Sequence, residues 1–286
     1  MKFQIYLFLF LLFLINACAS TGLKKSNILF FDAVRAGEKE KVKKFLTDGV
    51  SIEEKLLLED RFSKIKIPYT ALAFAAEAGN VQMLEFLLEN KAQVTPLSLE
   101  LALRNNHFTA VRYLLTHGGD PDKLLYYSVL LEKKQFTYEL IEKFNANVHV
   151  NDKDRFHDPI LVTAAFRNDD KLVSIALDKG ADPNIKRKSH ESALHYAVKN
   201  KNYKMVQELI KKGSKADFTE MMPASPLHFA SMNCDEKISK ALLNAGASMN
   251  SEHMDYELPI DDKTPLQIAQ KKCDTKFISF LKKQSK

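Results

Sequence analysis

Apolar residues recur along this chain at intervals of three and four, in short segments separated by polar stretches. Two such series are Val81, Leu84, Leu87 and Leu88, and Val206, Leu209 and Ile210. Because an α-helix turns once every 3.6 residues, this spacing places the apolar side chains of a segment on one face. The pattern predicts short amphipathic helices, each of which must cover its apolar face with a neighbour.

A second pattern marks where helices begin and end. Four segments share a Ser or Thr, then Ala or Pro, then Leu, and an Ala five positions after the start; they are residues 70–75, 192–197, 225–230 and 264–269. Ser and Thr cap free backbone N–H groups, and proline fits the first helical turn. Gly180, Gly213 and Gly246 follow each other at the same interval of 33 residues as Ser192 and Ser225, and glycine is the usual residue after a helix.

The 33-residue period and the T-P-L-H-like wording resemble the ankyrin repeat. The resemblance implies an all-α solenoid of about eight helix-turn-helix units, in which stacked neighbours supply the core. We place the repeat domain at residues 28–286, with units near 28–52, 69–95, 96–122, 123–148, 158–184, 191–217, 224–250 and 263–286. The third and fourth units are short, so we expect a trimmed hairpin there. The fourth lacks the T-P-L-H wording and is included because its flanks leave a repeat-sized gap.

His195 and His228 occupy the histidine position of that wording. In the ankyrin family this histidine forms hydrogen bonds that tie units together. A metal site is the alternative, but no Cys or carboxylate lies at ligand spacing from either residue. We therefore expect a structural role for both, and no metal or cofactor.

The N-terminus has a different character. Lys2 precedes an apolar run over residues 3–15, and small residues follow at 16–20, as in a secretory signal. The run is short for a membrane span. Ile15 to Cys18 resembles a bacterial lipobox, which implies a signal over residues 1–18, a lipid on Cys18 and a tether over 19–27. Asn16 departs from that pattern, and an ordinary cleaved signal is the alternative. Either implies export, and lipidation implies the bacterial envelope, in the periplasm or at the outer membrane.

Cys234 and Cys273 remain after the signal. An exported protein favours disulfides. Both cysteines, however, lie four residues after the helix alanine of consecutive units. Stacked helices lie about 8–10 Å apart, whereas a disulfide needs Cα atoms within about 7 Å. We expect free thiols.

The charge balance limits the choice of partner. The net charge is +6, without a long basic stripe interleaved with aromatics, so nucleic-acid binding is not expected. Residues 263–286 contain seven lysines and one acid, Asp274. This segment is either a solvated end of the array, or a dock for an acidic partner or an anionic surface.

The ankyrin resemblance also implies where a partner binds: at the hairpin tips and at the outer end of each first helix. The two positions beyond the small pair of each first helix hold six basic residues and two acids, Glu77 and Glu132. From these positions we take as candidate contacts Arg35, Arg104, Phe166, Arg167, Lys199, Met232, Lys271 and Lys272. Most are basic, with Phe166 and Met232 as apolar points. The hypothesis is a groove that binds an acidic protein segment, steered by charge.

These patterns favour a non-catalytic protein-binding scaffold that is exported, lipid-anchored and monomeric. The motifs G-x-S-x-G, H-E-x-x-H, the P-loop and paired Cys-x-x-Cys are missing from the sequence, so no catalytic residues are expected. Two alternatives stay open. One is an accessory protein that supports an exported enzyme, and the other is a secreted effector that binds host proteins.

Overall fold

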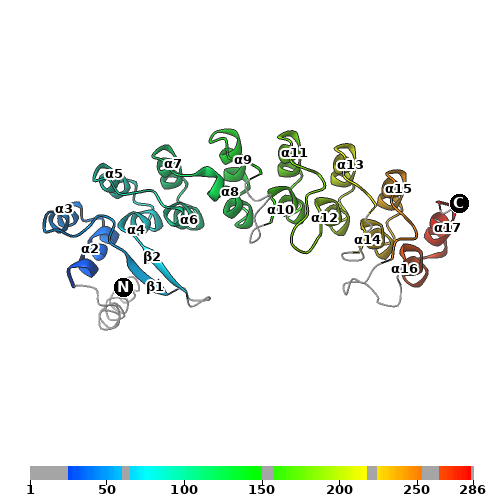
Figure 1. Ribbon diagram of the computed structural model, residues 1–286, viewed down its shortest axis with the longest axis horizontal. Coiled ribbons are helices and arrows are strands. Elements are labelled where there is room, and N and C mark those ends of the chain that lie inside the picture. The colour runs from blue at the N-terminus through cyan, green and yellow to red at the C-terminus, as the bar shows by residue number, and fades with distance from the viewer. Residues whose placement is uncertain (1–24, 60–64, 150–157, 218–223, 253–263, 285–286) are drawn as a thin grey trace. The chain divides into compact units, whose positions relative to one another are not determined.

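The computed structural model of the chain describes residues 25–59, 65–149, 158–217, 224–252 and 264–284. Within these residues it contains sixteen helices, arranged as successive antiparallel pairs, and one two-stranded sheet (Figure 1). The helical repeat solenoid expected from the sequence is confirmed. The chain divides into two compact units, residues 1–127 and 128–286, which are described separately below.

The first unit holds three helix pairs. They are α2 (Lys25–Ala36) with α3 (Lys39–Thr47), α4 (Ala71–Glu77) with α5 (Val81–Glu89), and α6 (Pro96–Arg104) with α7 (Phe108–Thr116). The first helices pack in order, α2 on α4 and α4 on α6, and α5 packs on α7. Phe30, Phe31 and Phe74 are fully buried and form an aromatic core. The division between the units falls within α8 (Pro121–Leu130).

The second unit continues the same pattern. It contains α9 (Lys134–Glu142), α10 (Ile160–Phe166) with α11 (Asp170–Asp178), α12 (Ala193–Lys199) with α13 (Tyr203–Lys211), α14 (Pro226–Met232) with α15 (Glu236–Asn244), and α16 (Pro265–Lys272) with α17 (Thr275–Gln284). The first helices α10, α12, α14 and α16 form one layer, and the second helices α11, α13, α15 and α17 form the other (Figure 1).

Helix caps explain why the repeated wording begins each first helix. The hydroxyl of Thr70 accepts a hydrogen bond from the backbone of α4, and Thr264 does the same at α16. In α14 the backbone N–H of Ser225 donates to Nδ1 of His228 at 3.1 Å. The imidazole proton therefore lies on Nε2, which donates to the carbonyl of Ser251 at 3.0 Å. This confirms the hydrogen-bonding role expected of His228; the His195 ring likewise accepts from its own cap, Ser192.

The segment after Ile52 contains an element that the sequence analysis missed. Strands β1 (Leu56–Glu59) and β2 (Lys66–Tyr69) form an antiparallel pair, with Leu56 opposite Tyr69. Leu56 is buried, and the Tyr69 ring lies 4.9 Å from that of Phe74 in α4. The hairpin is therefore fastened to the helical core through one of its faces.

One boundary of the sequence analysis needs adjustment. Helix α2 begins at Lys25, so residues 25–27 of the expected tether are helical. The residues of the fourth unit, which lacked the usual wording, form two helices, α8 and α9. The trimmed hairpin is also seen, because only residues 117–120 separate α7 from α8, whereas residues 179–192 separate α11 from α12.

The expectation of free thiols was wrong. Cys234 and Cys273 form a disulfide, with their Cα atoms 5.5 Å apart. The error came from applying the distance between helix axes to residues that lie beyond the helices. Cys234 sits in the turn after α14 with a left-handed backbone (φ 52°), and Cys273 is the C-cap of α16 in an extended conformation. At these ends the chain leaves the helical path, so the two backbones approach more closely than the packed axes do.

Candidate protein-interaction surface

The structure places every predicted contact residue at the C-terminal end of a first helix. They are Arg35 in α2, Arg104 in α6, Phe166 and Arg167 at the end of α10, Lys199 in α12, Met232 in α14, and Lys271 and Lys272 in α16. Helices α10, α12 and α14 pack side by side in that order (Figure 1). Phe166, Lys199 and Met232, at their C-terminal ends, therefore occupy successive positions along one edge of the second unit. We call this edge the first-helix edge. Arg35 and Arg104 belong to the other unit.

A repeated turn produces this alignment. Each first helix in this part of the second unit ends two residues before a residue with a left-handed backbone: Asn168 (φ 54°), Lys201 (φ 55°) and Cys234 (φ 52°). The chain reverses there and enters the second helix. Since the reversal occurs at the same position in each pair, counting along the sequence was sufficient to locate the helix ends.

Among the large apolar residues of the first-helix edge, Phe166 is the most exposed, and half of its surface is accessible to solvent. Its ring packs edge-to-face on Tyr196 at 5.3 Å. Leu130, at the end of α8, is also exposed, at 36%. Arg167 lies beside both: its guanidinium is 5.6 Å from the Phe166 ring, and it donates to the Leu130 carbonyl at 3.1 Å and to Glu132 at 2.6 Å. Leu130, Glu132, Phe166, Arg167 and Tyr196 are called the Phe166 patch below.

A polar network fixes Lys199, the next predicted contact. Its ammonium donates to Glu191 at 2.6 Å and lies 4.4 Å from the centre of the Phe229 ring. The Tyr196 hydroxyl donates to the other oxygen of Glu191 at 2.5 Å. Partial burial acts to raise the pKa of Glu191, but the hydrogen bonds from Lys199 and Tyr196 outweigh it, so this pKa lies below its ordinary value. For Tyr196, burial and the bond to Glu191 raise the pKa of the hydroxyl.

Arg187 extends this network into the loop before α12. Its guanidinium donates to the Tyr196 hydroxyl at 2.6 Å and pairs with Asp158 at 3.0 Å. Burial acts to lower the pKa of Arg187, and its hydrogen bond to Tyr196 and the nearby acids more than offset that effect. Tyr196 is therefore fixed by Glu191 and Arg187 at its hydroxyl and by Phe166 at its ring, so the ring on which Phe166 packs has a defined orientation.

The predicted cations of the first unit also have carboxylate partners. Arg35 lies 3.7 Å from Glu77 and 4.6 Å from the centre of the Phe74 ring. Arg104 donates to Glu100, four residues earlier in α6, at 2.5 Å. Together with Arg167 and Lys199, four of the predicted basic contacts are thus already engaged by acids. Sequence counting could not reveal this, because it registers charge but not proximity.

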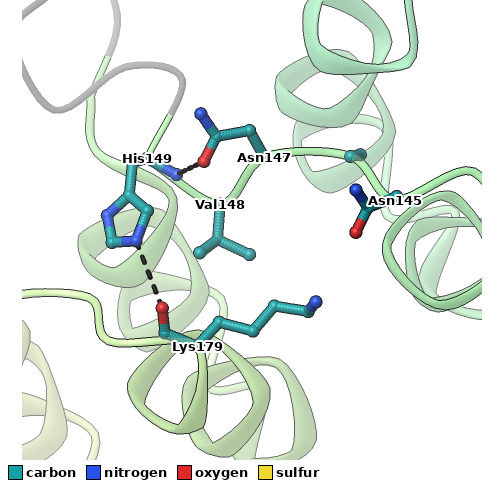
Figure 2. Close-up of a pocket in the computed structure, with 6 residues that line it drawn as sticks. Asn145, Asn147, Val148, His149 and Lys179 are labelled. Atoms are coloured by element: carbon teal, nitrogen blue, oxygen red, sulfur yellow. Dashed lines mark hydrogen bonds between the residues drawn. The ribbon is translucent and has the colours of Figure 1, made fainter.

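A shallow depression of about 260 Å³ lies elsewhere in the second unit, and no sequence signal pointed to it. Figure 2 shows the loop after α9 on one side and Lys179, the C-cap of α11, on the other. His149 approaches the Lys179 carbonyl at 3.3 Å, and its backbone N–H donates to Asn147 at 3.0 Å (Figure 2). Among the described residues, those that line the depression include no carboxylate or thiol that could act as a catalytic partner of this histidine.

Metal binding and membrane insertion are two further functions that the described residues bear on. No group of three or more His, Cys, Asp or Glu side chains there is placed to hold a metal ion. None of the helices in that part of the chain combines the length and apolar character needed to cross a bilayer. Cys18 and the expected signal lie outside the described residues.

Comparison with known proteins identifies the architecture. A family model described as ankyrin repeats (3 copies) matches residues 29–124, 125–221 and 161–253. These matches run from α2 to the loop after α15 and cover most of the chain. The search of curated proteins found no match. The resemblance noted in the sequence is therefore confirmed by the family model.

Proposed function

Since the chain belongs to the ankyrin-repeat family, a family of protein–protein interaction scaffolds, we propose that it is an exported, non-catalytic scaffold that binds a protein partner along its first-helix edge. The proposed contact centre is the Phe166 patch. Lys199, Met232, Lys271 and Lys272 extend the candidate contact set along this edge, and Arg35 and Arg104 are separate candidates in the first unit.

One observation carries the choice of the Phe166 patch. A large aromatic ring is half exposed, yet its orientation is fixed by Tyr196 below it and by Arg167 beside it. Interface hot spots are typically buried aromatic anchors with a polar rim. Because Phe166 stands on a packed helix, a partner would bind it with little loss of conformational entropy. Arg167 and Glu132 supply the polar rim.

The observed ion pairs reduce the contribution that charge can make to the affinity for an acidic partner. An acidic partner would have to displace Glu132 from Arg167, or Glu191 from Lys199, before forming its own ion pairs. Exchanging the partly exposed Arg167–Glu132 pair for another contributes little free energy, and the more buried Lys199–Glu191 pair would be costly to break. The proposal therefore relies on apolar contact with Phe166 for affinity, and assigns an acidic partner segment only a steering role.

The disulfide supports the export part of the proposal. Disulfides persist in oxidising compartments and are rare in the cytosol, where thiols are kept reduced. A bond between Cys234 and Cys273 thus agrees with the signal expected at residues 1–18. We propose that this signal directs export and that a lipid on Cys18 anchors the protein in the bacterial envelope.

Photo-cross-linking in living cells tests the binding surface. Benzoylphenylalanine in place of Phe166 should give a covalent adduct with one protein, while the same probe at Leu29, which is 44% exposed in α2, should not. With the purified partner, Phe166→Ala should weaken binding by roughly thirtyfold, as for a hot-spot aromatic. Leu29→Ala is the matched control. Equal adducts at both positions, or unchanged affinity of Phe166→Ala, would reject the proposed surface.

Metabolic labelling with an alkynyl fatty acid tests the anchor. The unaltered chain should incorporate the label, and Cys18→Ser should abolish it. A variant with Ser at both Cys234 and Cys273 serves as the control and should still be labelled. Labelling that survives Cys18→Ser would show that this cysteine does not carry the lipid.

A further inference from the structure

A cluster of lysines covers the outer surface of α16 and α17. Its members are Lys271, Lys272, Lys276, Lys282 and Lys283, all of them exposed, and together they are called the lysine face. Asp274 is the one acid between Pro265 and Gln284. Its carboxylate accepts a hydrogen bond from the backbone of Phe277 at 2.8 Å and so caps the start of α17. The one carboxylate between these residues is therefore engaged with the backbone of its own helix.

The helical period of α17 explains how its lysines share one surface. Phe277 and Leu281 are buried and point toward the preceding helices. At 100° per residue, Lys276, Lys282 and Lys283 fall on the opposite face, with the small polar Ser279 among them. Charged groups therefore project from this face without bulky side chains between them.

The lysine face differs from the Phe166 patch and the polar network beside it in how its charges are met. Arg167, Arg187 and Lys199 each pair with a carboxylate within 3.0 Å. By contrast, Lys272, Lys276 and Lys283 form no ion pair with any residue in the ranges that the structure describes. The field of these three ammonium groups is thus directed outward.

Two features indicate what the lysine face binds. All its cations are lysines, and an ammonium is a point charge without the planar fork by which arginine grips a single carboxylate. In addition, the exposed large apolar side chains of the described residues lie elsewhere, at Leu29, Leu57, Ile65, Leu130 and Phe166. A protein interface normally needs such anchors, whereas an array of mobile anionic headgroups requires only positive charge.

We propose that the lysine face binds the anionic phospholipid headgroups of a bilayer surface. This contact is separate from the Phe166 patch, and it does not require a lipid on Cys18. Each lysine near an anionic surface strengthens binding by about fivefold. Because the contact is electrostatic and exposed, salt should weaken it strongly.

Vesicle sedimentation with the full chain tests this proposal. Partitioning onto neutral phosphatidylcholine vesicles is compared with partitioning onto vesicles that also contain about 30% phosphatidylglycerol, at low ionic strength of about 50 mM. The test variant combines Lys272→Gln, Lys276→Gln and Lys283→Gln. The control combines Lys204→Gln, Lys211→Gln and Lys240→Gln, which removes the same charge from exposed positions of α13 and α15. The N-terminal segment is identical throughout and cancels from the comparison.

We expect the unaltered chain to prefer the anionic vesicles, and the test variant to lose roughly a hundredfold of that preference. The control should change it by less than about threefold, because its lysines lie outside the proposed contact. Absence of a preference in the unaltered chain, or an equal loss in the control, would overturn the proposal. Binding of a glutamate-rich peptide through the same lysines, without binding to the anionic vesicles, would make the face an acidic-protein dock and would also overturn it.

Discussion

The last helix pair, α16 and α17, is joined to the preceding pair both by packing and by the Cys234–Cys273 disulfide. We predict that replacing both cysteines with serine selectively loosens this pair. In a stacked repeat each unit depends on its neighbours, so a pair with weakened attachment opens before the rest.

The loop closed by the disulfide sets the size of the effect. The two cysteines are 39 residues apart in sequence, and loop-closure entropy for that length amounts to about 4 kcal/mol at 25 °C. The chain-entropy model assigns this amount to restriction of the unfolded state. Retained structure in the unfolded chain reduces it, so we expect a measured loss of about 2–4 kcal/mol.

Hydrogen exchange of the α17 amides measures the effect directly. Exchange should accelerate in the Cys234→Ser/Cys273→Ser variant, and adding dithiothreitol to the unaltered chain should reproduce the change. The variant itself should not respond to dithiothreitol, which separates the cross-link from the side-chain substitution. Titration of thiols in denaturant without reductant should find neither cysteine free. Two free thiols, or unchanged exchange after reduction, would refute this reasoning.

Two further predictions concern the turn glycines and the polar network. A Cβ at Gly49 (φ 89°) would meet open space, so Gly49→Ala should lower the free energy of unfolding only by the backbone strain, about 1 kcal/mol. At Gly79 (φ 68°) a Cβ would lie 2.5 Å from the His107 ring, so Gly79→Ala should lower the free energy of unfolding, measured in urea, by at least about 1 kcal/mol more. Equal costs would reject the steric argument. The lowered pKa of Glu191 means that its pairing with Lys199 stabilises the fold above about pH 4.5 and is lost as pH falls through the folded-state pKa. Glu191→Gln should therefore destabilise by about 1–3 kcal/mol at pH 7, and a difference from the unaltered chain that stays constant down to pH 3 would contradict it.

The sequence predicted helix positions well because a repeat has a fixed period. Phe166, Lys199 and Met232 were located by counting from the small residues of each first helix, and the structure places them on successive helix ends. The turn that makes this possible has a left-handed backbone at the same position each time, so errors do not accumulate along the array. Even the weakly marked fourth unit forms two helices.

Structural features that do not repeat with the 33-residue period could not be predicted by counting. The β1–β2 hairpin lies in an insertion, and its attachment depends on Tyr69 meeting Phe74, which no spacing rule encodes. The disulfide depends on where the chain leaves the two helices. At those ends the Cα atoms of the two cysteines are a few ångströms closer than the packed helix axes are. The pairing of Arg167 with Glu132 joins residues 35 positions apart, and net charge alone does not register it.

The cations of the second unit have two different roles, because some form ion pairs within the stack and others do not. The bonds of Arg167 to Glu132 and of Lys212 to Asp178 each cross from one helix pair to the next. Such charges stabilise the stack, so their number says little about the partner. Acids are scarce in α16 and α17, and Lys272, Lys276 and Lys283 there pair with no acid of the described residues. The distribution of acids, more than that of bases, therefore determines which basic surface is available to a ligand, and it favours apolar recognition at Phe166 with electrostatic recognition at the lysine face.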